Sequence, residues 1–136
     1  MTQESLREVG PFEIEITPDM VRRWAGATYD KPLKSAEKGA LAPPALLFWF
    51  TMMLRRDPNA PPREGDDAVQ STYDMETYRP IKVGEKLTLS GRLVRRYIKR
   101  EREYSVWDIR FQDEAGREVA RYQDEGLETY RKVGER

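Results

Sequence analysis

Two prolines followed by an almost unbroken apolar run constrain this chain more than any other feature. Pro43 and Pro44 precede ALLFWFTMMLRR at residues 45–56, which is apolar on every side until its two arginines. Periodicity does not separate such a run from a buried strand, but its length and its proline start favour a helix. A helix that is apolar all round must be enclosed, so the rest of the fold has to wrap around it.

The residues before this run predict a strand and a first helix. FEIEI at residues 12–16 alternates strictly, which is typical of a strand with one buried face. In TPDMVRRWAGA, which follows, Thr17 can cap a helix, Pro18 suits its first position and Asp19 faces the positive end of its dipole. We therefore expect a helix to start directly after the first strand.

After the run the pattern changes to strands. Residues 56–68 are rich in proline and charge and predict a solvated loop. Gly91 predicts a bulge or a close approach within its strand. The order favours an α+β class, in which a curved antiparallel sheet of about five strands wraps one long central helix. Strands are predicted at residues 68–78, 86–98, 103–112 and 117–131, with turns at 79–85 and 113–116.

Composition excludes several classes of function. A chain of 136 residues can bury a real core, so we expect a single domain over residues 1–136. Lysine plus arginine number 24 and aspartate plus glutamate number 24, so no net field attracts nucleic acid or an anionic membrane. With neither cysteine nor histidine, there is no disulfide framework and no thiol nucleophile, and we expect no metal and no cofactor. The N-terminus lacks a secretion pattern and the longest apolar run is about half a bilayer span, so a cytoplasmic protein is expected.

Four motifs, in order, resemble those of one known family. LAPPALLFWF at residues 41–50 resembles the segment that enters the central helix of MaoC-like dehydratase domains. YRPIKVGEKL at 78–87 is similar to the family's Tyr/Phe-x-Pro-x-x-x-Gly-Asp/Glu turn, and DEAGREVARY at 113–122 to its Asp-x-x-Gly-x-x-Val-Ala turn and strand. ITPDMVRRWAGATYDKPL at 16–33 resembles its opening strand, helix and acid-rich loop. The resemblance covers nearly the whole chain, favours the FAS1-type N-terminal domain and implies a hotdog fold.

One loop departs from the catalytic pattern of that family. Catalytic members look like R-specific enoyl-CoA hydratases or hydroxyacyl dehydratases, whose Asp-x-x-x-x-His side chains hold the water that adds across the double bond. Here Asp30 stands at the position of the acid and Lys34 at that of the histidine, in a loop one residue short. Histidine, with a pKa of ~6.5, suits proton transfer at neutral pH, whereas lysine at ~10.4 does not. The chain alone is therefore expected to have no catalytic residue for hydration.

The resemblance implies a role beside a catalytic partner. Hotdog domains work in pairs, with two sheets joined edge to edge and acyl tunnels along the seam. In the two-domain and two-subunit dehydratases, one hotdog carries the Asp/His pair and the other shapes the tunnel. We therefore expect a substrate-binding, non-catalytic subunit of a heteromeric enoyl-CoA hydratase or dehydratase. Its ligand would be an acyl-CoA or acyl-carrier-protein thioester. Its partner would be a hotdog chain bearing Asp-x-x-x-x-His, or otherwise a second copy of this chain.

Four polar residues are candidates for binding the substrate, each with a plainer alternative. Tyr29 and Asp30 either line the mouth of the tunnel or form an Asx-type turn before Lys-Pro. Lys34 either holds a phosphate of coenzyme A or is a solvated loop lysine. Arg79, with the basic run at residues 92–102, either meets nucleotide phosphates or is solvated.

Four further candidates belong to the apolar run. Pro43 leads into the backbone amides of Ala45 and Leu46, which either hold a thioester carbonyl or only start a helix. Trp49 either faces an acyl chain or packs in the core.

Other functions stay open at this point. A thioesterase would use Asp30 or Glu37 as a base or nucleophile without any histidine. A non-enzymatic acyl-CoA binding module would keep the tunnel and have no turnover. Nucleic-acid binding through residues 92–102 is disfavoured by the zero net charge.

Overall fold

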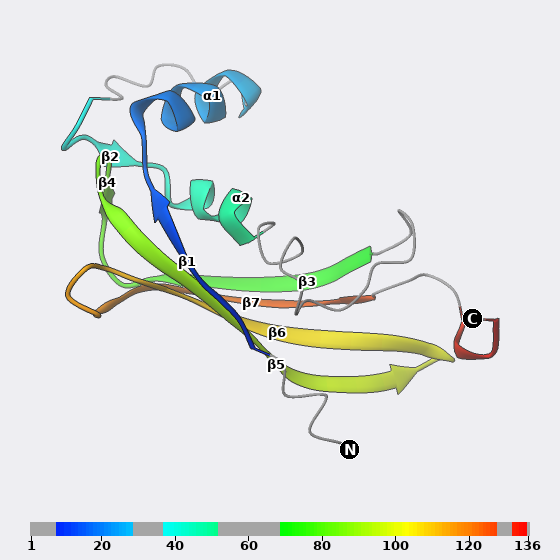
Figure 1. Ribbon diagram of the computed structural model, residues 1–136. Helices are drawn as coiled ribbons and strands as arrows, with labels where there is room; N and C mark the ends of the chain where they lie inside the picture. The colour runs from blue at the N-terminus through cyan, green and yellow to red at the C-terminus, as the bar shows by residue number, and fades with distance from the viewer. Residues whose placement is uncertain (1–7, 29–36, 52–68, 128–131, 136) are drawn as a thin grey trace.

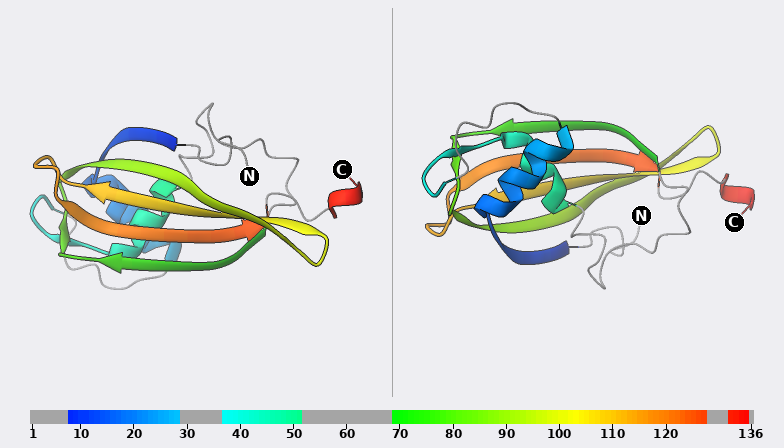
Figure 2. Two further views of the ribbon diagram at one scale, coloured as in Figure 1. Left: turned by 90° about the horizontal axis from the view of Figure 1, so that it is seen from below. Right: turned by 90° about the horizontal axis from the view of Figure 1, so that it is seen from above.

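The structure is a computed structural model that describes residues 8–28, 37–51, 69–127 and 132–135. Five of the described strands form an antiparallel sheet in the order β1-β5-β6-β7-β3, and helices α1 and α2 lie over it (Figure 1). Both helices lie on the same side of the sheet, here called the helix face. Figure 2 shows the opposite side, here called the open face, without any described helix over it.

The strands follow the predicted order along the chain. Two further two-residue strands, β2 (Leu41–Ala42) and β4 (Ile81–Lys82), pair with each other beside the main sheet. The strands of the main sheet are β1 (Glu8–Glu15), β3 (Val69–Thr77), β5 (Lys86–Lys99), β6 (Arg102–Gln112) and β7 (Glu118–Leu127).

Strand β6 shows why the sheet has one apolar and one charged face. Ile109 and Phe111 are buried in the core on the helix face, and Trp107 packs partly against it. Asp108 and Arg110 alternate with them and therefore lie on the open face. This alternation confirms the strand predicted from the sequence.

Helix α1 (Pro18–Thr28) also begins as predicted. The amide of Met20 donates a hydrogen bond of 3.2 Å to the Thr17 hydroxyl, which is the expected cap. Asp19 forms an exposed ion pair with Arg23 one turn later, at 3.0 Å. Val21 is fully buried and holds the helix against the core.

The apolar run departs from the prediction in two ways. It opens as a 3-10 turn, Pro44–Leu46, and continues as the short helix α2, Leu47–Thr51. The rest of the expected helix, to residue 56, lies outside the described residues, so one long central helix is not confirmed. Nor is the run enclosed all round: Leu46, Leu47 and Phe50 are buried, but Trp49 is 38% exposed.

Two smaller predictions need correction. Residues 79–85, expected as a turn, contain strand β4, which pairs with β2 through Leu41 opposite Lys82. A bulge, one of the two alternatives at Gly91, is found instead between Leu93 and Arg95, while Gly91 pairs in register with Ile109. The other alternative, a close approach at Gly91, stays a prediction. The loop predicted at residues 56–68 lies outside the described residues.

Gly10 marks a close approach between β1 and β5. Its φ is +85°, and an added Cβ would lie 2.7 Å from the carbonyl oxygen of Leu89. The register of β1 on β5 shifts at the same place, between Val9 and Phe12. A side chain here is therefore opposed both by the backbone angle and by fixed backbone atoms.

We predict that Gly10→Ala lowers the free energy of unfolding by about 2–3 kcal/mol, because β1 must shift to relieve the contact. Urea denaturation measures the loss. Gly116→Ala is the matched control: its φ is +81°, but nothing lies within 4 Å of the added Cβ. It should cost only about 1–2 kcal/mol. Equal losses would show that the contact with Leu89 is unimportant.

Candidate functional site

An apolar hollow lies where the end of β3 meets the start of the apolar run. Its volume is about 610 Å³ and it is open to solvent. A concave, mostly apolar surface with few polar groups is typical of a small-molecule site. Its lining residues are Leu41, Ala42, Pro43, Pro44, Thr77, Tyr78, Arg79 and Pro80.

The small β2–β4 ladder positions the walls of this hollow. Ala42 and Ile81 face each other in the ladder and are both buried. Leu41, next to Ala42 in β2, is 63% exposed, and Tyr78, directly after β3, is 49% exposed. The Tyr78 amide donates a 2.9 Å hydrogen bond to the carbonyl of Val119, which fixes the end of β3 on β7. Apolar groups thus stay exposed on a rigid frame.

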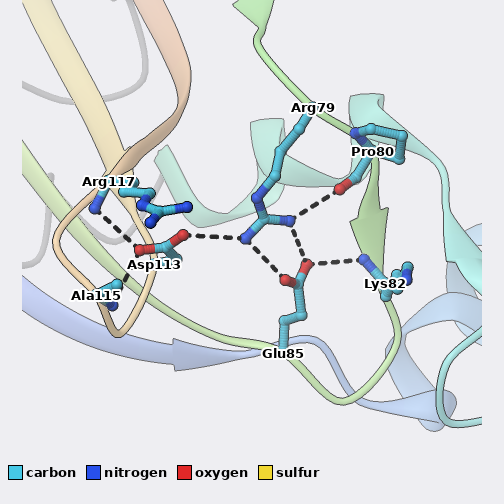
Figure 3. A network of polar contacts seen from close by, with 7 residues as sticks. All are labelled: Arg79, Pro80, Lys82, Glu85, Asp113, Ala115 and Arg117. Carbon is cyan, nitrogen blue, oxygen red and sulfur yellow. Dashed lines mark hydrogen bonds and ion pairs between the residues drawn. The ribbon is translucent and has the colours of Figure 1, made fainter.

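Arg79 is held by two carboxylates, as Figure 3 shows. Its Nη2 lies 2.8 Å from Glu85 Oε1 and 3.4 Å from Asp113 Oδ2. Its Nη1 donates to Glu85 Oε2 at 3.1 Å and to the Pro80 carbonyl at 2.9 Å. The guanidinium therefore ties together the turn before β5 and the turn between β6 and β7.

These contacts favour the ionised carboxylates. Burial disfavours the charge on Glu85, but hydrogen bonds from Arg79 and from the Lys82 amide outweigh it and lower the pKa of Glu85. The amide of Arg117 is the main cause that lowers the pKa of Asp113, and Arg79 adds to it. The geometry gives Arg79 a structural role, and its contact with a nucleotide phosphate stays a prediction.

The helix start is only partly arranged as expected. Pro43 lines the hollow, and the Leu46 amide donates to the Pro43 carbonyl at 3.0 Å, so that amide is already in use. Ala45 is exposed next to it. Trp49 packs edge-to-face on Trp24, with ring centroids 5.0 Å apart.

The structure thus brings two of the eight predicted residues, Pro43 and Arg79, to one hollow. Tyr29, Asp30 and Lys34 lie outside the described residues, so their roles stay predictions. Glu37 is exposed and is not among the residues that line the hollow.

Sequence reasoning missed most of the walls, among them Leu41, Ala42, Thr77, Tyr78 and Pro80. The YRP motif, which contains Tyr78 and Pro80 and resembles a motif of the fold, is the signal in the sequence that points to this wall. Its contact with the proline pair was not visible, because the two segments lie far apart in the chain.

A second hollow, of about 530 Å³, lies on the open face, and three of its charged lining residues, Asp108, Arg110 and Glu118, pair with one another. Arg110 lies 2.9 Å from Asp108 and 2.6 Å from Glu118, and Arg121 lies 3.1 Å from Asp108. Burial opposes the charge on Asp108, but the two arginines outweigh it and lower its pKa. These ion pairs satisfy one another, which makes this hollow the weaker candidate.

Two further features are absent from the described part of the chain. Its residues contain no group of three or more acidic, histidine or cysteine side chains placed to hold a metal ion. No helix within these ranges is long and apolar enough to cross a membrane.

Comparison with known proteins identifies the fold. No protein-family model and no curated protein matches the sequence. A MaoC-like dehydratase matches with a TM-score of 0.72 and 19% identity, over 90% of this chain and 40% of that chain. The HadBC (3R-hydroxyacyl-ACP dehydratase) complex from Mycobacterium tuberculosis matches with a TM-score of 0.69 and 14% identity, over 90% and 93%. The ChsH1-ChsH2 complex of the same organism matches with a TM-score of 0.67 and 15% identity, over 93% and 90%.

The chain therefore has the hotdog fold that these dehydratases share, as predicted from the motifs. An R-hydratase from A. caviae also matches, with a TM-score of 0.66 and 10% identity, over 90% of this chain and 94% of that chain. At these identities the likeness establishes the fold and leaves the activity to be argued from the site.

We predict that Arg79→Met lowers stability and weakens its dependence on acid pH. In the folded chain the pKa values of Glu85 and Asp113 lie below those of the unfolded chain. Their contribution is therefore present at neutral pH and is lost as the pH falls from about 4 downward, through the folded-state values. Without Arg79, about 1 kcal/mol should be lost at pH 7, and less of the remaining stability should vanish in acid.

Urea midpoints measured at several pH values test this prediction. Arg23→Met is the control, because it removes an exposed ion pair with Asp19. It should leave both the stability and its pH dependence nearly unchanged. An Arg79→Met protein with the wild-type pH dependence would contradict the structural role of Arg79 between the two turns.

Proposed function

We propose that this chain is the substrate-binding, non-catalytic subunit of a heteromeric MaoC-like enoyl-CoA hydratase or 3-hydroxyacyl-thioester dehydratase. One observation carries the proposal: a fold shared with such enzymes occurs in a chain with no histidine. Hydration needs a group that transfers a proton near neutral pH, and imidazole is the side chain that does so without a large pKa shift. The catalytic pair would then come from another chain.

Two of the matched structures support a heteromeric assembly. HadBC and ChsH1-ChsH2 are both described as complexes, and this chain covers 90% or more of the matched chain in each. The hollow beside Tyr78 lies at the last residue of β3, and β3 is an edge strand of the described sheet. A partner sheet that joins there would cover the hollow.

The hollow suits the thioester ligand in its chemistry. Its walls are mostly apolar, through Leu41, Pro43, Pro44 and Pro80, and apolar area removed from water favours binding of an acyl or pantetheine chain. Thr77 and Tyr78 are the uncharged polar residues among its walls. Such a site would bind and orient the thioester while the partner moves the proton.

The first experiment separates this role from the alternatives. The purified chain alone should not hydrate crotonyl-CoA or a long-chain enoyl-CoA, because it has no imidazole. With a co-purified hotdog partner that carries Asp-x-x-x-x-His, the rate should rise by about 100-fold or more. The partner alone and a His→Ala partner are the controls, and absorbance of the enoyl thioester is the readout.

Each other outcome has a distinct meaning. Hydration by the single chain would refute the non-catalytic role. Release of free coenzyme A from saturated acyl-CoA by the single chain would identify a thioesterase. Tight binding of acyl-CoA without turnover in any mixture would identify a binding module.

A second experiment tests the hollow. Leu41→Asp places a charge in its apolar wall and should raise KM for the enoyl thioester about tenfold in the active complex, with kcat little changed. Ile98→Asp is the matched control, because Ile98 is 61% exposed, close to the 63% of Leu41, but lies near the tip of the β5–β6 hairpin. Equal effects of the two substitutions would remove the hollow from the proposal.

A further inference from the structure

The two edges of the sheet differ in their capacity to pair with another strand. Strand β1 contains Pro11, which has no amide hydrogen. Both edge strands have one register shift, between Val9 and Phe12 in β1 and between Gln70 and Thr72 at the start of β3, so the proline is what distinguishes them. Strand β3 lies at the opposite edge, contains no proline and is 9 residues long. In the described part of the chain it pairs with β7 and with no strand on its other side. Such an edge is a ready template for a further strand.

On the helix face, the β3 edge exposes aromatic side chains. Tyr73 is 61% exposed, although its ring stacks on that of Tyr122 with centroids 5.5 Å apart. Phe48 of α2 packs against the Tyr73 ring from another side, with ring centroids 6.1 Å apart. Aromatic side chains that are fixed by neighbours yet exposed are typical of protein interfaces.

On the open face, the same edge is acidic. Asp74 pairs across the sheet with Gln123, and Glu76 with Arg121, which places both carboxylates on the open face, where both are exposed. Strand β3 contains no lysine or arginine. Arg121, which is opposite Glu76 in the ladder, forms an ion pair with Asp108 at 3.1 Å.

The same negative charges affect the neighbouring Tyr78. Burial and the charges of Glu76 and Glu118 raise the pKa of the Tyr78 hydroxyl, and together they outweigh the opposing charge of Arg121. The end of the edge therefore combines acidic groups with an exposed aromatic ring.

We propose that β3 is a charge-selective docking strand, which pairs with a basic edge strand of a different chain and disfavours a second copy of itself. A symmetric pair brings the same patch of both chains together. Asp74, Glu76 and their two copies would then share one face of a two-stranded ribbon with no cation on either strand. Like charges across strands destabilise the pair, whereas lysine or arginine on the partner strand would stabilise it.

This inference takes from the proposed function only the expectation that the partner is a second hotdog chain. The charge rule itself depends on β3 alone. It is a rule of specificity, because the unfavourable self-pairing excludes the wrong partner as much as the favourable pairing selects the right one.

The charge-reversed variant Asp74→Lys/Glu76→Lys serves as a defined basic partner. At low salt, its mixture with the wild-type chain should form heterodimers with a Kd at least about tenfold below that of either homodimer. Added salt should reduce this preference, because the charges are exposed. Sedimentation velocity of each protein and of the mixture measures the association. The neutral variant Asp74→Asn/Glu76→Gln should self-associate more tightly than the wild type.

The control makes the same charge change near the opposite edge. Glu13→Lys/Glu114→Lys replaces two exposed carboxylates, one on β1 and one in the β6–β7 turn. It should not bind the wild-type chain more tightly than the wild type binds itself. Equal association by the control, or wild-type self-association as tight as that of the neutral variant, would overturn the proposal.

The two proposals fail separately. Loss of hydratase reconstitution with intact charge-dependent pairing would refute the proposed function and leave the docking rule standing. If the complex hydrates the thioester but pairing does not change with the charges of β3, the docking rule alone is refuted.

Discussion

The packing of Leu46, Leu47 and Phe50 against the sheet is the interaction on which the rest of the described structure depends. All three are buried on the helix face, where they meet the apolar residues of the central strands. Each large apolar side chain contributes about 1.5–3 kcal/mol on burial, which is a large share of a typical stability of about 5–15 kcal/mol. The prolines that start this segment also form a wall of the hollow. The same short stretch thus supports the fold and shapes the site.

Local pattern was sufficient for much of the fold and insufficient for the parts made by distant residues. The alternation through Ile109 and Phe111 predicted β6, and Thr17 predicted the start of α1, because each signal lies within a few residues. The β2–β4 ladder has two residues on each side, too few for any periodicity to appear. Arg79 binds Asp113, 34 positions later, and no local pattern predicts such a contact.

The candidate site divides in the same way. Pro43 was predicted from its motif, whereas the hollow exists because residues 41–44 and 77–80 meet in space. The missing imidazole is a fact of the whole sequence and needs no geometry. Unaided hydration is therefore disfavoured wherever Asp30 and Lys34 lie, whereas the proposed substrate binding requires the hollow.

Docking and substrate binding would be linked in this arrangement, because the edge strand continues into the wall of the hollow. Thr77 ends β3 and lines the hollow, and Tyr78 follows it directly. A partner strand paired with β3 would cover the apolar wall, and a thioester bound there would touch both chains. By linkage, the factor by which the partner tightens thioester binding equals the factor by which the thioester tightens assembly. A subunit without a catalytic pair can in this way still determine which substrate assembles the active enzyme.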